Sequence, residues 1–504
     1  MPAATGETNL PSGCPVTRAW LLLSSVLLLS ACGTTPAPIA EPSPVPARAT
    51  YPWITDDLGR VLILHGANVD GSAKATPDHM PHQDRATIER MVTDWGWNHA
   101  RFLIFWDGLE PEPGIIDEAY LDLIETRLDW FAEMGVWVVL DMHQDVYSAA
   151  FCCDGAPAWA IRDDGEPFEL QSSWFLNYFQ PAVKRAWDNF WLYTDGDHAD
   201  LQDHYGDAWV AVASRFADHP AVLGYDLMNE PHAGSMSDVV ELLGTENPGG
   251  THPEFDRTRL QPFYQRLIDR IRAVDPDSWV FFEPRYGAPG DGRRSYMGVL
   301  TDPRPEGDRL VYYPHLYSVD LEASGEYDLT GDTSVLDWES ERAVELQAQN
   351  APMAIGEWGL AQGTVNVEQF MADVLAMADR LMGGWAYWDY SFGGWIPMDS
   401  DGVERPTMDL LVRAYPRAVA GTPTSFGYDP DARVFFLEFE SREGVQGPTE
   451  IYVPAARHYP EGWQLTVSAP EGSWRQDWDA GAEVLSVTIE AEGAHRIEVR
   501  PADG

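Results

Sequence analysis

The stretch VLGYDLMNEP, residues 222–231, runs from apolar and aromatic residues into an amide, a carboxylate and a proline. Asn, Glu and Pro are poor strand formers, and Pro cannot donate a hydrogen bond to a neighbouring strand. The order predicts a buried strand whose last polar residues, Asn229 and Glu230, emerge into a loop. An ordinary turn with a solvated carboxylate contains the same tripeptide, so the assignment depends on the rest of the chain.

A short apolar run followed by a longer amphipathic stretch recurs from residue 60 to residue 390. Near-continuous apolar runs are typical of parallel strands buried on both faces. Eight such strands predict an α/β fold, a (β/α)8 or TIM barrel, over residues 50–418. A doubly wound open sheet is the alternative, but its glycine fingerprint is absent after the first strand. The strand candidates span residues 61–69, 99–105, 136–143, 222–230, 279–284, 310–317, 352–358 and 383–390.

Polar residues occur at the ends of these strand candidates. The carboxyl ends of barrel strands share one face, where barrel enzymes carry their active sites. The sequence therefore predicts a concave site with converging polar groups on that rim. The residues expected there are His65, Asn68, Arg101, His143, Asp145, Asn229, Glu230, His315, Tyr317, Glu357 and Trp388.

The pattern of apolar and polar residues changes after residue 418. Short runs with period-two alternation, punctuated by Gly and Pro, predict a C-terminal antiparallel β-sandwich over residues 419–504. No catalytic constellation occurs in this segment. The alternating runs span residues 433–439, 449–455, 463–469, 484–490 and 495–500.

The composition excludes some functions. The chain has 504 residues, 44% hydrophobic, with a net charge of −47 and only two lysines, Lys74 and Lys184. So acidic a chain is not expected to bind nucleic acid, because few groups would neutralise phosphates. The sequence contains no motif for a phosphate, a nicotinamide or a metal, so no cofactor is predicted. It does not indicate an oligomeric state, and a monomer is the default.

The N-terminal segment predicts export. Arg18 precedes the apolar run WLLLSSVLLLSA, which is the length of a signal-peptide core and too short to span a bilayer. LSAC, residues 29–32, resembles a lipobox, which predicts a lipoprotein signal peptide over residues 1–32 and lipidation of Cys32. An ordinary secretory signal is the alternative. A Pro-rich linker follows over residues 33–49. We expect an extracytoplasmic protein, anchored to a bacterial membrane or secreted.

Two adjacent cysteines, Cys152 and Cys153, follow the third strand candidate. A vicinal disulfide and two free thiols both remain open at this stage. A metal site is not indicated, because neither a further nearby Cys nor a helical HxxxH pattern accompanies them.

Two carboxylates on the predicted rim, Glu230 and Glu357, suit glycoside hydrolysis. One protonates the leaving oxygen while the other attacks the anomeric carbon. One must therefore stay protonated while its partner is ionised, so their surroundings must differ.

The motifs HGANVDGSAKATPDHMP, LDMHQDVYS, GAPAWA, DLMNEP, PHLY and IGEWG, in this order, resemble glycoside hydrolase family 5 of the 4/7 retaining superfamily. The similarity covers roughly residues 50–500 and is strongest to bacterial endoglycoceramidases. It implies hydrolysis of the linkage between oligosaccharide and ceramide in glycosphingolipids, with release of intact glycan and ceramide. It also implies an apolar groove for ceramide, for which Phe392, Trp395 and Ile396 are candidates.

The resemblance implies a role for each site residue. Glu230 is expected as the acid/base and Glu357 as the nucleophile, with Tyr317 bonded to the nucleophile. Asn229 is expected to bind the sugar 2-hydroxyl. The other residues expected to bind substrate are Arg101, His143, His315, Lys74, Asp145, Trp388 and Trp174.

Departures from the family pattern leave the glycan preference open. Trp358 follows the nucleophile where Phe is usual, and Asp389 and Tyr390 are expected near the sugar. One alternative is a related endoglycosidase that prefers galactosylceramide-type linkages. Another is a family 5 endoglucanase or mannanase acting on soluble polysaccharide. The alternative from another class is an inactive glycan-binding lipoprotein, which would keep its function when Glu230 or Glu357 is replaced by Gln.

Overall fold

The computed structural model describes residues 53–192, 200–237, 252–287, 290 and 292–502. The chain divides into two units, Met1–Pro44 and Val45–Gly504, and every described residue belongs to the second. The predicted signal peptide, the lipidation site Cys32 and the linker 33–49 lie outside the described residues. Across the described ranges, no helix combines the length and the apolar character needed to cross a bilayer.

Eight parallel strands form the sheet that organises this unit, in the order β7-β6-β5-β4-β3-β2-β9-β8. Parallel bridges between Tyr312 and Met353 and between Leu316 and Trp358 join the two outermost strands. The sheet therefore closes, which confirms the predicted (β/α)8 barrel. Its strands are β2 (His65–Val69), β3 (His99–Phe105), β4 (Trp137–His143), β5 (Val222–Asp226), β6 (Trp279–Phe282), β7 (Leu310–Tyr312), β8 (Ala354–Trp358) and β9 (Gly384–Tyr387).

The first strand candidate, 61–69, is split in two. β1 (Val61–Leu62) pairs antiparallel with β10 of the C-terminal domain, and the barrel strand begins only at His65. Asn98 occupies the break, because its side chain accepts a hydrogen bond from the His65 N–H at 2.9 Å and donates to the Ile63 carbonyl at 3.0 Å. The side chain thus replaces the strand partner that both backbone groups lack.

The candidate strand 222–230 is also shorter than predicted. β5 ends at Asp226, so Asn229 and Glu230 stand in the loop beyond it. The predicted strand 310–317 likewise becomes β7, which ends at Tyr312.

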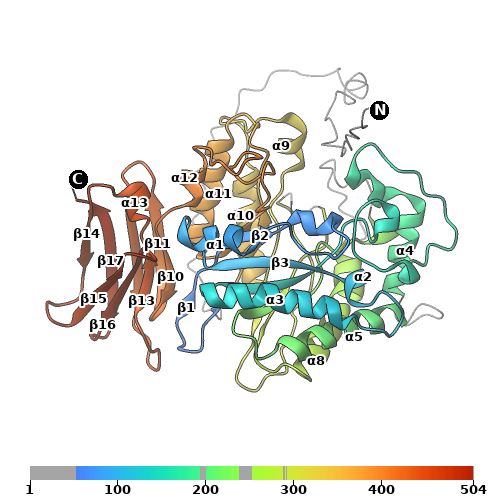
Figure 1. The fold of residues 1–504 in the computed structure, drawn as a ribbon, viewed down its shortest axis with the longest axis horizontal. Coiled ribbons are helices and arrows are strands. Elements are labelled where there is room, and N and C mark those ends of the chain that lie inside the picture. Colours follow the sequence, from blue (N-terminus) through green and yellow to red (C-terminus); the bar gives the residue numbers. More distant parts are fainter. Residues whose placement is uncertain (1–52, 193–199, 238–251, 288–289, 291, 503–504) are drawn as a thin grey trace, which may run out of the picture. The chain divides into compact units, whose positions relative to one another are not determined.

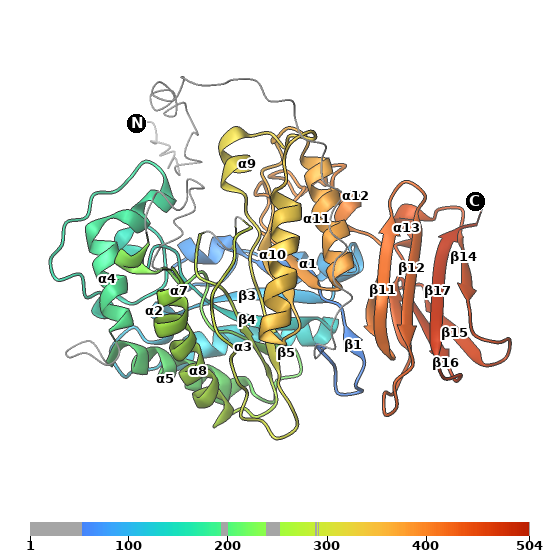
Figure 2. The same ribbon diagram turned by 180° about the vertical axis from the view of Figure 1, so that it is seen from behind.

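Helices surround the barrel strands. α3 runs just below β3 in Figure 1, and α10 and α11 are in front when the molecule is seen from behind in Figure 2. α3 begins after Asp117, whose side chain accepts from two N–H groups of the first turn, and it ends at Gly135 with φ +67°. The long helices are α1 (Arg85–Thr93), α3 (Glu118–Met134), α4 (Pro181–Trp191), α5 (Asp200–Phe216), α8 (Gln261–Arg272), α10 (Ser334–Gln349) and α11 (Val367–Leu381).

Short helices lie in the loops between these elements. The α-helical ones are α2 (Trp106–Leu109), α7 (His252–Phe255), α9 (Val319–Ser324), α12 (Met408–Leu411) and α13 (Ala455–His458). The 3-10 turns are η2 (Gly71–Ala75), η3 (Ala149–Phe151), η4 (Ala158–Ala160), η5 (Trp174–Phe179) and η6 (Gly234–Met236), and η7 (Asp256–Leu260) is a π-helical turn that leads into α8.

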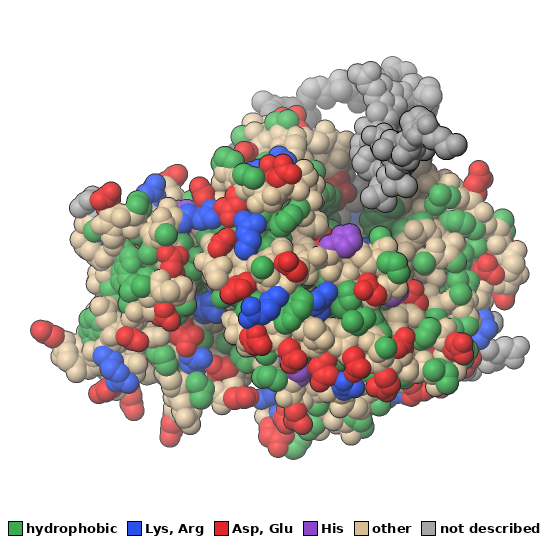
Figure 3. Space-filling model, viewed as in Figure 1, with side chains coloured by type: hydrophobic (Ala, Val, Ile, Leu, Met, Phe, Trp, Pro, Cys, Tyr) green, Lys and Arg blue, Asp and Glu red, His purple; other side chains and the backbone are tan. Residues whose placement is uncertain are grey.

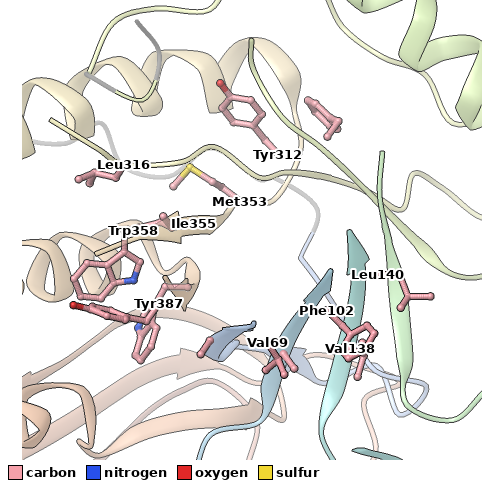
Figure 4. Packing of buried hydrophobic residues seen from close by; sticks show 14 of the residues in the cluster. Val69, Phe102, Val138, Leu140, Tyr312, Leu316, Met353, Ile355, Trp358 and Tyr387 are labelled. Atoms are coloured by element: carbon pink, nitrogen blue, oxygen red, sulfur yellow. The ribbon is translucent and has the colours of Figure 1, made fainter. Parts of the chain in front are cut away.

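Both faces of the barrel strands are buried. Val138 and Leu140 of β4 belong to the larger apolar cluster, part of which Figure 4 shows, while Val139 between them belongs to a separate cluster. Successive side chains of a strand point to opposite faces, so each strand needs apolar residues at nearly every position. Trp358, which departs from the family pattern, is fully buried in the larger cluster beside Tyr387 (Figure 4).

The C-terminal domain consists of two antiparallel sheets, which confirms the predicted sandwich. The sheet orders are β1-β10-β13-β16-β15 and β11-β12-β17-β14. β10 begins four residues before residue 419, and β1 joins from the N-terminal side of the barrel. The strands are β10 (Tyr415–Val419), β11 (Thr422–Asp429), β12 (Val434–Glu440), β13 (Thr449–Tyr452), β14 (Trp463–Val467), β15 (Trp474–Asp479), β16 (Val484–Ile489) and β17 (Ala494–Pro501).

His65 does not reach the rim at which the sequence placed it. It is the first residue of β2, at the amino end of the strand, and is 1% exposed. Its ring stacks on Tyr415 of β10, with centroids 3.8 Å apart, and lies beside Trp385. His65 is therefore a packing residue between the barrel and the sandwich.

Part of the acidic excess lies at the surface. Figure 3 shows red side chains along the face that α3 covers, and Glu118, Asp122, Asp129 and Glu133 of that helix are exposed. Such a surface repels polyanions.

Candidate active site

A cavity of about 510 Å³ opens at the carboxyl ends of the barrel strands. Four of the residues predicted on the rim are not part of its lining: His65, Asn68, Arg101 and His315. Arg101 and His315 are buried beneath the carboxylates instead, with exposures of 0% and 3%, and Asn68 is buried beside Arg101. The predicted residues that line the cavity are Lys74, His143, Asp145, Trp174, Asn229, Glu230, Tyr317, Glu357 and Trp388.

Glu357 is the fourth residue of β8, and both its carboxylate oxygens are held. Arg101 donates to Oε1 at 2.6 Å, and the Tyr317 hydroxyl donates to Oε2 at 2.9 Å. Burial alone would raise the pKa of Glu357, but the positive charges of His315 and Arg101 outweigh it and hold the pKa below its usual range. Glu357 is therefore ionised.

Arg101, in the middle of β3, organises the floor of the site. Its guanidinium is fully buried and binds side chains from several strands. A buried cation of this kind is stable only when it is fully surrounded by acceptors. Its hydrogen-bond acceptors are Asn68 (2.9 Å), Asp226 (2.9 Å), Asn229 (2.9 Å), Glu283 (2.8 Å) and Glu357 (2.6 Å), and Asp141 lies at 3.0 Å.

Glu230 stands four residues beyond β5 with a left-handed backbone, φ +42°. The loop is held from two sides. Glu283, directly after β6, accepts from the Glu230 N–H at 2.9 Å, and Gln144 donates to the Glu230 carbonyl at 3.0 Å. His315 Nδ1 lies 2.9 Å from Oε1 of the side chain. Such anchoring offsets the cost of a strained backbone conformation at a functional residue.

The two glutamates face each other across a short gap. One oxygen of Glu230 and one of Glu357 lie within 4.8 Å of each other. Burial, together with the negative charge of Glu357, raises the pKa of Glu230 despite the neighbouring His315. The pKa values of the pair thus shift in opposite directions, which separates a proton donor from an ionised nucleophile.

His315 lies between the carboxylates. Burial would lower its pKa, but Glu283 and Glu357 raise it well above the usual value. The imidazolium is 2.9 Å from Glu230 and 3.6 Å from Glu357. Its charge favours ionisation of Glu357.

A second group of charges lies beside the pair. Lys74 of η2 forms an ion pair with Asp145, and its ammonium lies 4.4 Å from the centre of the Trp388 ring. Burial disfavours the charged form of both residues, but each charge stabilises the opposite charge of its partner. The pKa of Lys74 is therefore raised and that of Asp145 lowered. The ring of His143 stacks on Trp388, with centroids 5.6 Å apart. Aromatic rings beside charged hydrogen-bonding groups are suited to binding a sugar ring.

His143 and Asn229 have fixed orientations. His143 Nδ1 contacts Asp141 at 2.6 Å, and although burial and Lys74 lower its pKa, Asp141 helps to raise it to about 9. Asn229 accepts from Arg101 and donates to the Gln144 carbonyl at 3.0 Å. The amide therefore presents a defined edge to the cavity.

Cys152 and Cys153 form a vicinal disulfide, and both line the cavity near Trp174. This settles the alternative between a disulfide and free thiols in favour of the disulfide. Trp174 begins η5 and is 49% exposed.

Of the residues expected to form the ceramide groove, Trp395 lines the cavity and packs edge-on against Tyr317. Phe392 is 42% exposed at the surface, whereas Ile396 is fully buried in the core and does not contribute to a groove.

Asp389 and Tyr390 do not line the cavity as expected. Asp389, which a cis peptide bond joins to Trp388, accepts from the Gly71 N–H at 2.8 Å and so holds the turn that carries Lys74. Tyr390 is buried and donates to the Thr87 carbonyl.

Three residues were not identified in the sequence: Gln144 and Glu283, which hold the backbone of Glu230, and Asp154, which lines the cavity. A signal existed for Glu283, because Glu283-Pro284 follows an apolar strand just as Glu230-Pro231 does. Gln144 and Asp154 lie in a loop whose path has no local sequence signature.

The fold and the paired carboxylates define a barrel glycosidase, and comparison with known proteins agrees. Residues 63–394 match the Cellulase family (glycosyl hydrolase family 5), and residues 413–499 match the glycoside hydrolase family 5 C-terminal domain. The chain belongs to glycosyl hydrolase family 5 and is a glycoside hydrolase.

Several proteins with similar sequences or structures are endoglycoceramidases. Endoglycoceramidase I of Rhodococcus hoagii (strain 103S) is 31% identical over 456 residues, covering 88% of this chain and 86% of that protein. Endoglycoceramidase of Hydra vulgaris is 27% identical over 82% of this chain and 81% of that protein. The ganglioside GM3 complex of endo-glycoceramidase II from Rhodococcus sp. has a TM-score of 0.82 and 37% identity, covering 90% of this chain and 100% of that chain. A lactosyl-enzyme intermediate of the same protein has a TM-score of 0.80 and 38% identity, with the same coverage of both chains.

Proposed function

We propose that this protein is a retaining endo-β-glycosidase that hydrolyses the linkage between oligosaccharide and ceramide in glycosphingolipids. The observation that carries the proposal is the carboxylate pair, with oxygens of Glu230 and Glu357 within 4.8 Å and pKa values shifted in opposite directions. Retaining glycosidases hold their carboxyl groups about 5–5.5 Å apart, whereas inverting enzymes need about 6.5–9.5 Å to admit a water molecule.

The reaction proceeds in two displacements. The ionised Glu357 attacks the anomeric carbon while Glu230 donates its proton to the departing ceramide oxygen. This releases ceramide and leaves the glycan as an ester on Glu357. Glu230, now a carboxylate, takes a proton from water, which attacks the same carbon and releases the glycan with regeneration of both groups.

The neighbouring residues position the sugar. Asn229 would bind the 2-hydroxyl, and Lys74, Asp145 and Trp388, which line the same cavity, would hold the sugar next to the cleaved bond. Arg101 and His315 do not bind the sugar but keep Glu357 ionised, a change from their expected role.

The ceramide specificity is supported by the endoglycoceramidases among the similar proteins. The apolar side of the cavity, with Trp395 and Tyr286, would receive the lipid.

The test is incubation of the full chain, in detergent, with lactosylceramide, a ganglioside, galactosylceramide and a soluble β-glucan, followed by mass spectrometry. Free oligosaccharide with intact ceramide is the expected result, and the variants E230Q and E357Q should release neither. Cleavage of the glucan alone would replace the proposal with a soluble-polysaccharide hydrolase. Preference for galactosylceramide would establish the related galactosyl-specific activity.

We further propose that the protein is exported and anchored through a lipid on Cys32. The support is the sequence alone: the apolar run ending in LSAC and the Pro-rich linker after it. Expression with a radiolabelled fatty acid in a bacterial host should label the wild-type chain and not C32A. Equal labelling of both, or of neither, would contradict the anchor.

A further inference from the structure

Asp154 is a buried carboxylate with no partner. It is 1% exposed and belongs to the cavity lining, yet neither of its oxygens has a hydrogen-bond partner among the described residues. Burial, together with the negative charge of Asp145, raises the pKa of Asp154 to about 7. Buried polar groups in folded proteins are nearly always paired, so a lone carboxylate at a cavity wall needs an explanation.

The disulfide directly before Asp154 forms the adjoining part of the wall. Cys152 is exposed and Cys153 half-buried, and both line the cavity. Asn177 ties this wall to the neighbouring aromatic, because its side-chain amide donates to Cys152 Sγ at 3.5 Å and to the Trp174 carbonyl at 2.9 Å. The disulfide, Asp154 and Trp174 thus belong to one connected surface.

Backbone pairing locates this surface. Asp145 and Asp154 form an antiparallel bridge, each N–H donating to the other's carbonyl at 3.3 Å. Since Asp145 holds Lys74, the disulfide lies next to the charged group beside Trp388 and therefore on the glycan side of the cavity.

The loop that carries the disulfide is well anchored. Ser148 donates to the Ala156 carbonyl at 2.7 Å, and the buried Phe151 packs on Phe168. Gly155 has φ +120°, and a Cβ there would lie 2.5 Å from Gln144. The wall is therefore a fixed part of the cavity.

We propose that Asp154 and the Cys152–Cys153 disulfide form a subsite for the second sugar of the glycan, with Trp174 as its neighbouring aromatic. The assignment rests on the proposed glycosidase function and extends it to glycan selection. A carboxylate accepts hydrogen bonds from two sugar hydroxyls, and turning the Asp154 side chain toward the cavity would break no hydrogen bond, because its carboxylate oxygens make none among the described residues. The polarizable sulfurs offer an apolar surface to the C–H face of a ring. The negative charge disfavours an acidic sugar, so the subsite fits a neutral one.

Asp154→Asn tests the polar half of this subsite. Charged hydrogen bonds lost from a binding site correspond to roughly tenfold or more in affinity. We expect kcat/KM for an aryl β-lactoside to fall about tenfold and that for an aryl β-glucoside to stay unchanged, with no loss of Tm. The matched control is the exposed Glu166→Gln, which should change none of these values. An equal fall for both substrates, or a lower Tm with no selective effect, would overturn the subsite.

Cys152→Ser with Cys153→Ser tests the other half. This double variant should lose about fivefold to tenfold in kcat/KM for the lactoside only. Dithiothreitol, which transfers two electrons and two protons to the disulfide and is itself oxidised to a cyclic disulfide, should reproduce the loss in the wild type and have no effect on the variant. A wild type that is fully reduced by mass yet keeps its lactoside activity would exclude the disulfide from the subsite.

The outcomes separate the two proposals. If the wild type cleaves neither glycoside, the glycosidase function itself fails. If the wild type cleaves both and the variants match it on both, the function stands and only the subsite is rejected.

Discussion

The carboxylate of Glu283 accepts a hydrogen bond from the backbone N–H of Glu230 at 2.9 Å. The same side chain receives Arg101 and lies 3.2 Å from His315 Nε2. Although burial would raise its pKa, His315 and Arg101 outweigh burial and lower it, which favours an ionised Glu283 beneath the catalytic pair. It both fixes the position of the proton donor and influences its pKa.

Glu283→Gln should therefore change the pH profile as well as the rate. The charge of Glu283 raises the pKa values of Glu230 and His315, so its removal lowers both. We expect the basic limb of kcat/KM to move to lower pH and the rate at neutral pH to fall at least about tenfold. A purely structural role would lower the rate and leave the limb in place.

Tyr317→Phe should shift the acidic limb of the pH profile of kcat/KM. The variant removes the donor to Glu357 Oε2, and loss of a hydrogen bond to an ionised carboxylate raises its pKa. We expect the acidic limb to move upward and kcat/KM to fall about tenfold to a hundredfold. Tyr312→Phe is the matched control, since it removes a similar buried bond to Glu345 away from the cavity and should leave the limb unmoved.

Lys74→Met should cost both stability and activity. It removes the closest cation of the buried Asp145 and leaves His143 Nε2 at 3.8 Å, and breaking such a buried pair typically costs up to about 3–5 kcal/mol. The double variant Lys74→Met, Asp145→Asn should recover most of that stability in urea unfolding but not the activity. Recovery of activity along with stability would show that the pair is only structural.

The buried neutral His65 should make the fold sensitive to acid. Burial, followed by the charge of Arg413, lowers its pKa well below 6.5, so the unfolded chain binds the proton more readily than the folded one. Its contribution to stability is complete above about pH 6.5 and is lost as the pH falls below that value, at up to about 1.4 kcal/mol per pH unit. Thermal unfolding between pH 7 and pH 4 should show a smaller loss for His65→Phe. An identical loss would assign the acid sensitivity to other groups.

Much of the barrel could be predicted from the sequence. Parallel strands buried on both faces leave a clear apolar signature, and the prediction for 99–105 matches β3 at both ends. The predicted strand boundaries were wrong where a side chain takes the place of a backbone partner, as Asn98 does between Ile63 and His65. Local pattern does not reveal a partner that lies more than thirty residues away.

The sequence predicted most of the polar residues that line the cavity, but it did not show which residues lie beneath the catalytic carboxylates. Glu230 and Glu357 follow from the strand ends, whereas Arg101 lies inside β3 and His315 three residues beyond β7, and local pattern does not show that both are buried beneath the carboxylates. Asp154 could not be identified because nothing local marks a carboxylate as unpartnered.

The most direct test of the retaining mechanism is the mass of E230Q after mixing with a dinitrophenyl β-lactoside. This leaving group needs no proton, so the first displacement proceeds while the second, which needs the base, is slow. We predict that the protein gains one lactosyl group and that peptide mapping places it on Glu357. Turnover without a covalent adduct, or an adduct on any other residue, would contradict the account.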